Sequence, residues 1–120
     1  MKLDLIVVNS SSNIQLLSIV GNVEVGQVTP FGEEFEKLCE GPPVKLILDV
    51  KGADRIDSSG IGELIKARND IVQRGGQVVL MGVSSRIERI INISGLHNYF
   101  PIALSVPAAI ELLTETTCLI

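Results

Sequence analysis

The stretch D-R-I-D-S-S-G-I-G-E-L-I, residues 54–65, lies where an apolar strand gives way to a helix. Immediately before it, V-K-L-I-L-D-V at 44–50 is a nearly continuous apolar run of strand length, which is typical of a buried central strand. After it, apolar residues recur at helical spacing and predict a helix over residues 58–74 that begins at the serine pair. The apolar face of that helix is expected to consist of Ile61, Leu64, Ile65, Ile71 and Val72.

The residues before this stretch predict two strands and a helix. Apolar segments at 3–8 and 14–20, separated by the polar turn N-S-S-S-N, predict a hairpin-like antiparallel pair that Gly21 closes. A helix is predicted next, because apolar side chains then recur at helical spacing. They are Phe31, Phe35, Leu38 and Cys39. G-P-P at 41–43 ends that helix, since proline cannot continue it.

The residues after the central stretch repeat the alternation of strand and helix. Strands are predicted at 77–83 and 101–105. Between them, Ser85 stands three residues before Glu88, which is the spacing of a capping box at a helix start. Gly95 is suited to end that helix, and Pro107 fits the first turn of a terminal helix.

These elements predict a single α/β domain over residues 1–120, with a central mixed sheet of four to five strands packed with about four helices. A composition of 46% hydrophobic and 20% charged residues is that of a globular protein, and 120 residues suffice for one core. Right-handed crossovers make the later strands parallel. Sites in such sheets lie at the carboxyl ends of the strands, and we expect residues 51–60 to form that edge of the central strand.

Charge and hydropathy argue against two kinds of partner. The formal net charge is −4 and the chain has no basic run, which argues against direct nucleic-acid binding. The apolar run near the N-terminus covers only residues 5–8, whereas a secretory segment needs about 7–15 apolar residues and a membrane span about 20. Cys39 and Cys118 lack metal-ligand spacing and are expected to be reduced. We therefore expect a cytoplasmic protein without membrane contact.

The polar residues at the helix start allow two interpretations. Asp57, Ser58 and Ser59 are all favoured N-cap residues, so the motif can be a structural helix start. A single cap, however, needs only one such residue. Gly60 and Gly62 allow an unusual backbone or close packing against the strand, but each costs up to about 1 kcal/mol relative to alanine in a helix. A functional role for one of the serines is the second interpretation.

The motif D-S-S-G-I-G at 57–62 resembles the D-S-S-G-L-G motif of STAS domains, in particular bacterial anti-sigma factor antagonists. L-I-L-D-V before it is similar to the central strand of that family, and R-G-G-Q-V-V-L resembles its next helix–strand junction. S-S-R-I-E-R-I-I-N-I-S-G-L at 84–96 resembles the helix that follows. The resemblance is good over residues 44–100 and weaker on either side.

The resemblance implies a regulatory binding protein, not an enzyme, and no cofactor. In such proteins the first serine after the aspartate, here Ser58, is phosphorylated by an ATP-binding serine kinase that is often itself the anti-sigma factor. The unmodified antagonist binds this kinase and frees the sigma factor, and a PP2C-type phosphatase resets the cycle. A phosphate at position 58 suits a helix N-terminus, where free N–H groups and the helix dipole favour negative charge.

The expected partner interface follows from the same resemblance. It consists of Asn22, Glu24, Asp57, Ser58, Ser59, Gly60 and Ile61. G-N-V-E at 21–24 keeps only the glycine and one acid of the family's G-E-L-D-like turn, which leaves the identity of the partner open. Arg55 either steers a partner or offsets the neighbouring acids. The alternative function is a STAS scaffold or transporter-associated subunit that works by protein contacts without phosphorylation.

Other kinds of site have weaker support in the sequence. His97 is the single histidine and no G-x-S-x-G elbow is present, which disfavours a serine hydrolase. Asp49, Asp54 and Asp57 lack the adjacent acidic pair of a metal-binding receiver domain, so no metal site is expected. G-I-G is not a dinucleotide-binding fingerprint and no P-loop lysine follows it. A small-ligand-binding or catalytic α/β domain stays open as a third class.

Overall fold

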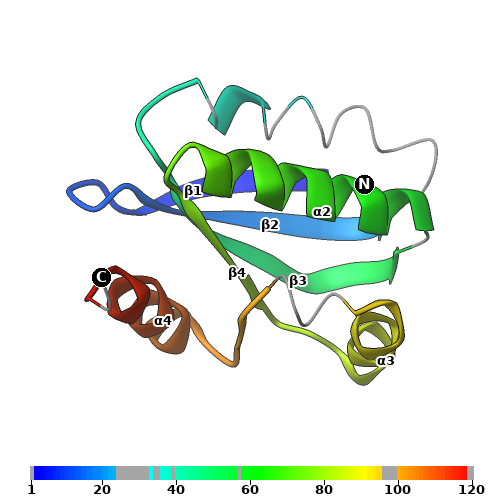
Figure 1. Ribbon diagram of the computed structural model, residues 1–120. Coiled ribbons are helices and arrows are strands. Elements are labelled where there is room, and N and C mark those ends of the chain that lie inside the picture. Colours follow the sequence, from blue (N-terminus) through cyan, green and yellow to red (C-terminus); the bar gives the residue numbers. More distant parts are fainter. Residues whose placement is uncertain are drawn as a thin grey trace.

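The computed structural model describes residues 2–23, 33, 36–38, 40–56, 58–95 and 100–118. Its elements are β1 (Lys2–Asn9), β2 (Ile14–Val23), β3 (Lys45–Ile56), α2 (Ser58–Gln73), β4 (Gln77–Met81), α3 (Ser85–Ser94), β5 (Ile102–Ala103) and α4 (Val106–Cys118). The five strands form one sheet in the order β1-β2-β3-β4-β5 (Figure 1). β1 is antiparallel to β2, and every later neighbour is parallel. The predicted mixed sheet with an antiparallel edge is confirmed.

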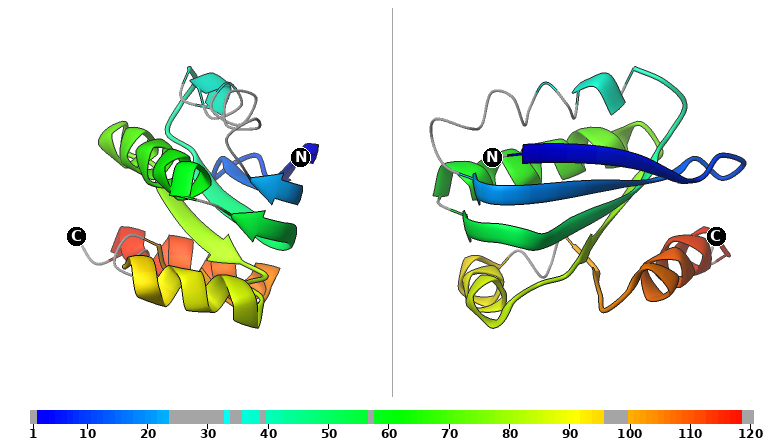
Figure 2. Two further views of the ribbon diagram at one scale, coloured as in Figure 1. Left: turned by 90° about the vertical axis from the view of Figure 1, so that its right-hand side faces the viewer. Right: turned by 180° about the vertical axis from the view of Figure 1, so that it is seen from behind.

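Helices cover both faces of this sheet. One buried cluster joins the inner strands to α2 and α3, and a second joins the opposite face of the same strands to α4. α4 accordingly lies on the other side of β4 from α2 (Figures 1 and 2). Side chains of a strand alternate between the two faces. Leu46 and Leu48 of β3 therefore pack in the first cluster and Ile47 in the second.

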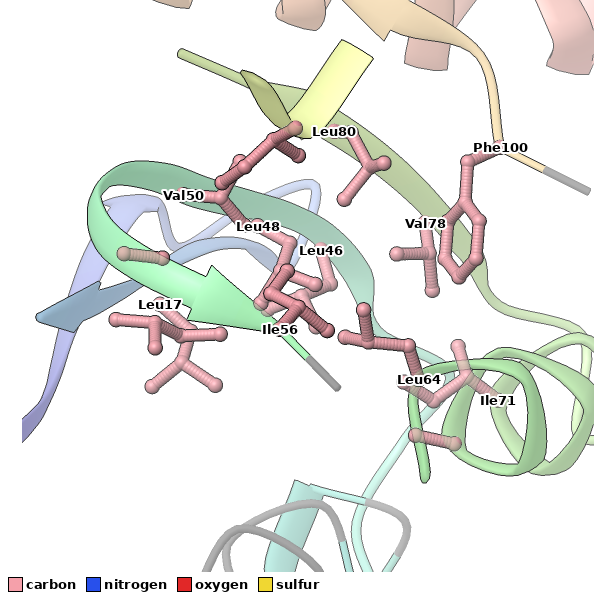
Figure 3. Packing of buried hydrophobic residues seen from close by; sticks show 14 of the residues in the cluster. Leu17, Leu46, Leu48, Val50, Ile56, Leu64, Ile71, Val78, Leu80 and Phe100 are labelled. Atoms are coloured by element: carbon pink, nitrogen blue, oxygen red, sulfur yellow. The ribbon is translucent and has the colours of Figure 1, made fainter. Parts of the chain in front are cut away.

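The predicted central strand is confirmed by its burial. Leu46, Ile47 and Leu48 are all 0% exposed. Figure 3 shows Leu46 and Leu48 packed among side chains of β2, β4 and α2. Burying each such side chain contributes about 1.5–3 kcal/mol relative to leaving it in water, and β3 supplies such side chains to both faces.

Two strands extend several residues beyond their predicted ends, and both do so toward the motif. β2 does not end at Gly21 but continues to Val23. Gly21 has a φ of 101° and lies at an irregularity in the register between β2 and β3. β3 continues to Ile56, six residues past the predicted strand end at 50, so Arg55 lies within the strand. The two strands pair closely here, since a Cβ built on Gly52 would lie 2.9 Å from Cγ2 of Val20. A side chain at position 52 would therefore push the two strand ends apart.

The predicted helix over 58–74 is confirmed as α2, which begins at Ser58 and ends one residue early at Gln73. The side chains that it packs into the core are Ile61, Leu64, Ile65, Ala67 and Ile71. The sequence pattern did not identify Ala67. It also placed Val72 on the buried face, which is wrong, because Val72 is 39% exposed.

The N-cap of α3 lies one residue before the predicted one. The N-cap is Ser84, whose Oγ accepts a hydrogen bond from the Ile87 N–H at 3.3 Å, while Ser85 is already the first helical residue. The predicted capping box of Ser85 and Glu88 is therefore wrong. The predicted stop is confirmed, since Gly95 is left-handed with a φ of 76° and its N–H donates to the Ile91 carbonyl.

Exchanging these two serines for alanine should separate the cap from its neighbour. We expect Ser84→Ala to lower the free energy of unfolding by about 0.5–2 kcal/mol, because it leaves a helix N–H without its acceptor. Ser85→Ala serves as the matched control and should change it by less than about 0.5 kcal/mol. Urea unfolding followed by circular dichroism measures both. A larger loss in Ser85→Ala would contradict the assignment of the cap.

The remaining predictions concern β4, the terminal elements and the first helix. β4 covers Gln77–Met81 and ends two residues before the predicted 83. Pro107 is the second residue of α4, as expected, whereas β5 covers only two residues of the strand predicted at 101–105. Leu38 is buried in the first cluster, within a helical segment at 36–38. The rest of the predicted stripe lies outside the described residues: Phe31, Phe35 and Cys39. Among the helices that the structure describes, none is long and apolar enough to cross a membrane.

Candidate functional site

The motif lies at the junction between β3 and α2. β3 ends at Ile56 and α2 begins at Ser58, so a single residue separates the central strand from its helix. That residue, Asp57, lies outside the described residues, and of Ser58 and Ser59 the structure describes the backbone alone. The serine pair forms the start of the helix, as predicted. Position 58 is therefore at the carboxyl end of the central strand, where α/β sheets place their sites.

The end of β2 lies beside this junction. In the parallel register of β2 and β3, Asn22 is the partner of Arg55 and Val23 is the partner of Ile56. The two strand ends run side by side next to the start of α2 (Figures 1 and 2). The structure thus places position 22 near position 58, although 35 residues of sequence separate them. Glu24, which follows β2, lies outside the described residues.

The first turn of α2 is anchored on the core. Gly60 is buried, and the half-buried Ile61 packs against the first cluster. Ile61 also borders a small apolar hollow with a free volume of about 10 Å³. The lining residues are Val50, Ile56, Ile61, Leu64, Leu80, Ile87 and Ile91. Because these residues come from β3, β4, α2 and α3, Ile61 at the start of α2 lies where these four elements meet.

Gly62 differs from the expectation for the two motif glycines. It was expected to serve an unusual backbone or close packing against the strand. It is instead an exposed residue of α2, its φ is not in the left-handed region, and a Cβ built on it meets no atom within 4 Å. Nothing in the described part of the chain requires glycine at this position. Sequence reasoning did not place Gly62 in the interface.

The N-terminus of α2 itself suits a negative group, whereas Asp57 directly before it in the sequence is acidic. The first turn of α2 contains no acidic residue, and the helix runs for 16 residues. The first N–H groups of an α-helix have no partner within the helix, and its N-terminus carries a partial positive charge. An anion at this end is typically favoured by about 0.3–1 kcal/mol. A phosphate on position 58 is thus compatible with the fold.

The other candidate residues form no second site in the described structure. Asp49 Oδ1 accepts a hydrogen bond from the Lys51 N–H at 2.9 Å, a local contact along β3. Within the ranges that the structure covers, no group of three or more His, Cys, Asp or Glu side chains could hold a metal ion. His97 and the side chains of Asp54 and Cys118 lie outside those ranges.

Comparison with known proteins agrees with this arrangement. The STAS domain family matches residues 6–109, which is most of the chain and includes the strand ends and the start of α2. The chain belongs to the STAS domain family. The family match extends well beyond residues 44–100, where the sequence resemblance is good, and it begins within the antiparallel edge strand.

One curated relative of this STAS domain is the anti-sigma F factor antagonist of Paenibacillus polymyxa, which is 32% identical over 57 residues. That match covers 48% of this chain, and the chain spans about half of the relative's length, 49%. The anti-sigma factor antagonist SpoIIAA in its unphosphorylated form has a similar structure, with a TM-score of 0.78 and 17% identity, over 95% of this chain and 97% of SpoIIAA. The Bacillus cell fate determinant SpoIIAA in its phosphorylated form has a TM-score of 0.70 and 18% identity, over 92% and 97%.

Proposed function

We propose that this STAS domain is an anti-sigma factor antagonist that regulates sigma-factor-dependent transcription by partner switching. In its unmodified form it binds an anti-sigma factor that is also a serine kinase, and phosphorylation of Ser58 releases it. A PP2C-type phosphatase removes the phosphate. The protein acts by binding and performs no chemistry of its own. Its place of action is the cytoplasm, where sigma factors and their antagonists meet.

The observation that carries this proposal is the position of Ser58. It is the first residue of α2, directly beyond the carboxyl end of the central strand and beside the end of β2. A serine at the end of an element is more accessible to a kinase than one within it. The relatives support the same function, since the proteins matched above are named as anti-sigma factor antagonists and SpoIIAA occurs in both phosphorylation states.

The switch acts at the interface rather than on the fold. A phosphate adds about −1.5 to −2 charges, and the helix start favours that charge in the free protein. In a complex the same charge would lose its water at the contact with the partner, which is costly unless a cation meets it. If the unphosphorylated and phosphorylated forms differ by about 5.5 kcal/mol in their affinity for the partner, the ratio of bound to free antagonist changes from 99:1 to 1:99.

The interface proposed around Ser58 combines residues of two elements. Asn22 and Glu24 come from the end of β2 and the segment that follows, and the others come from the start of α2 and the residue before it. These others are Asp57, Ser58, Ser59, Gly60 and Ile61. The scaffold or transporter-associated alternative is not favoured, because the relatives reported above are antagonists.

Mapping the phosphorylated residue tests the proposal. Incubation with the cognate kinase and ATP should place phosphate on Ser58 and not on Ser59, because the motif aligns Ser58 with the modified serine of the family. Phosphopeptide mapping by mass spectrometry measures this. Ser58→Ala is the control and should abolish incorporation, whereas Ser59→Ala should retain it. Phosphate found on Ser59 alone would show that the assignment is off by one residue.

A further inference from the structure

Gly62 is an exposed glycine in a helix, and the described part of the structure gives no reason for it. Glycine is the least favourable helix residue after proline, and alanine is the most favourable. A tight turn, a left-handed backbone or a close neighbour would explain it. None applies, since α2 is helical through position 62, its φ is not left-handed, and an added Cβ meets no atom within 4 Å.

Other glycines of the chain have clear structural reasons. Gly75 has a φ of 89°, which L side chains rarely adopt. Gly76 has no room, because a Cβ there would lie 2.7 Å from Cγ2 of Ile71. Gly62 therefore differs from them: it lowers the stability of the helix without serving the described structure. A requirement from outside this chain accounts for it best.

The position of Gly62 relative to Ser58 indicates what that requirement is. The two residues are four apart in one continuous α-helix, so they lie on the same face, one turn from each other. Every Cα–Cβ bond of an α-helix tilts toward the N-terminus, so a side chain covers the surface of the turn before its own. A side chain at position 62 would thus extend over the turn that begins with Ser58.

The next outward position of the same helix carries a full side chain. Lys66 lies one turn after Gly62 and is exposed. The exposed face of α2 therefore carries a long side chain one turn further along the helix. The missing side chain is the one that would cover the first turn.

We propose that Gly62 keeps the approach to Ser58 open, so that the partner kinase packs directly on the helix backbone at position 62. This inference rests on the proposed function, because it assigns Gly62 to the same interface. The contact requires close approach, and any side chain at 62 would hold the partner away from the hydroxyl group that it modifies. The residue would thus be retained for recognition at the expense of helix stability.

The test compares Gly62→Ala and Gly62→Gln with wild type. The binding partner in this test is the cognate kinase. It is purified from the source cell by following its ATP-dependent phosphorylation of this chain. We expect Gly62→Ala to raise the melting temperature by roughly 2–5 °C, since it removes a helix glycine. Gly62→Gln should bind the kinase at least tenfold more weakly and be phosphorylated correspondingly more slowly, with the alanine variant in between. Calorimetric titration and phosphorylation rates measure the effect.

Gly41→Gln is the matched control. Gly41 is another exposed glycine at which an added Cβ meets nothing within 4 Å, and it precedes the opposite, amino end of β3. Its variant should bind within about twofold of wild type, which is about 0.4 kcal/mol. Lys66→Gln controls for a change on the same helix face and should also stay within about twofold.

Two results would overturn the inference. The first is wild-type affinity of Gly62→Gln together with weakened binding of Ser58→Asp, in which case the proposed function stands and the role of Gly62 does not. The second is a lower melting temperature of Gly62→Ala, which would show that the fold itself needs this glycine. Equal affinity of wild type, Ser58→Asp and Gly62→Gln would instead contradict the proposed function.

Discussion

Replacing Ser58 by aspartate should weaken binding to the cognate kinase at least tenfold, whereas alanine at the same position should preserve it. Tenfold corresponds to about 1.4 kcal/mol. The aspartate introduces a second carboxylate next to Asp57 in the sequence, within a contact that we expect to lose its water, and an unpaired charge there is costly. Alanine is small and neutral, so it keeps the surface of the unphosphorylated form but cannot accept a phosphate.

Both Ser58 variants should stay folded, which makes the comparison interpretable. Ser58 is the first helical residue of α2, where aspartate suits the positive end of the helix dipole, and alanine should cost no more than the loss of a cap, about 0.5–2 kcal/mol. A domain of this size typically has about 5–15 kcal/mol of stability. Calorimetric titration of wild type and both variants into the kinase measures affinity, with circular dichroism as the folding control. Equal affinity for all three folded proteins would place Ser58 outside the interface and favour the scaffold alternative.

The second large effect is expected in the core of α2. Leu64 is 2% exposed and lies between the helix and the sheet, close to the start of α2 (Figure 3). Leu64→Ala should lower the free energy of unfolding by about 2–5 kcal/mol, because it removes buried methyl groups and leaves a cavity. Urea denaturation monitored by circular dichroism measures the change.

Val72→Ala is the matched control on the same helix. Val72 is 39% exposed, so its truncation should change the free energy of unfolding by less than about 0.5 kcal/mol. Periodicity alone places both residues on the apolar face and would predict similar losses. A loss in Val72→Ala as large as that of Leu64→Ala would contradict the packing of α2 described above.

The sequence by itself determined the order and type of the elements. The apolar run before the motif, the serine pair and the two glycines at 75 and 76 predict a strand, a helix start and a helix end, and all three are found there. Such features are local: they depend on propensity, capping and backbone conformation within a few residues. The motif at Ser58 was identifiable for the same reason, since its residues are contiguous.

The tertiary structure decided where strands end and which side chains are buried. Nothing local signals that β3 runs to Ile56, because D-R is a poor strand sequence and it is pairing with β2 that extends the strand. The same pairing brings Asn22 to the end of β3 that precedes α2, although the two are distant in the sequence. Exposure of Val72 and the open space around Gly62 depend on which neighbours the sheet places against α2. Burial is a property of the assembled layers, so periodicity determines the face of a helix but not the edge of that face.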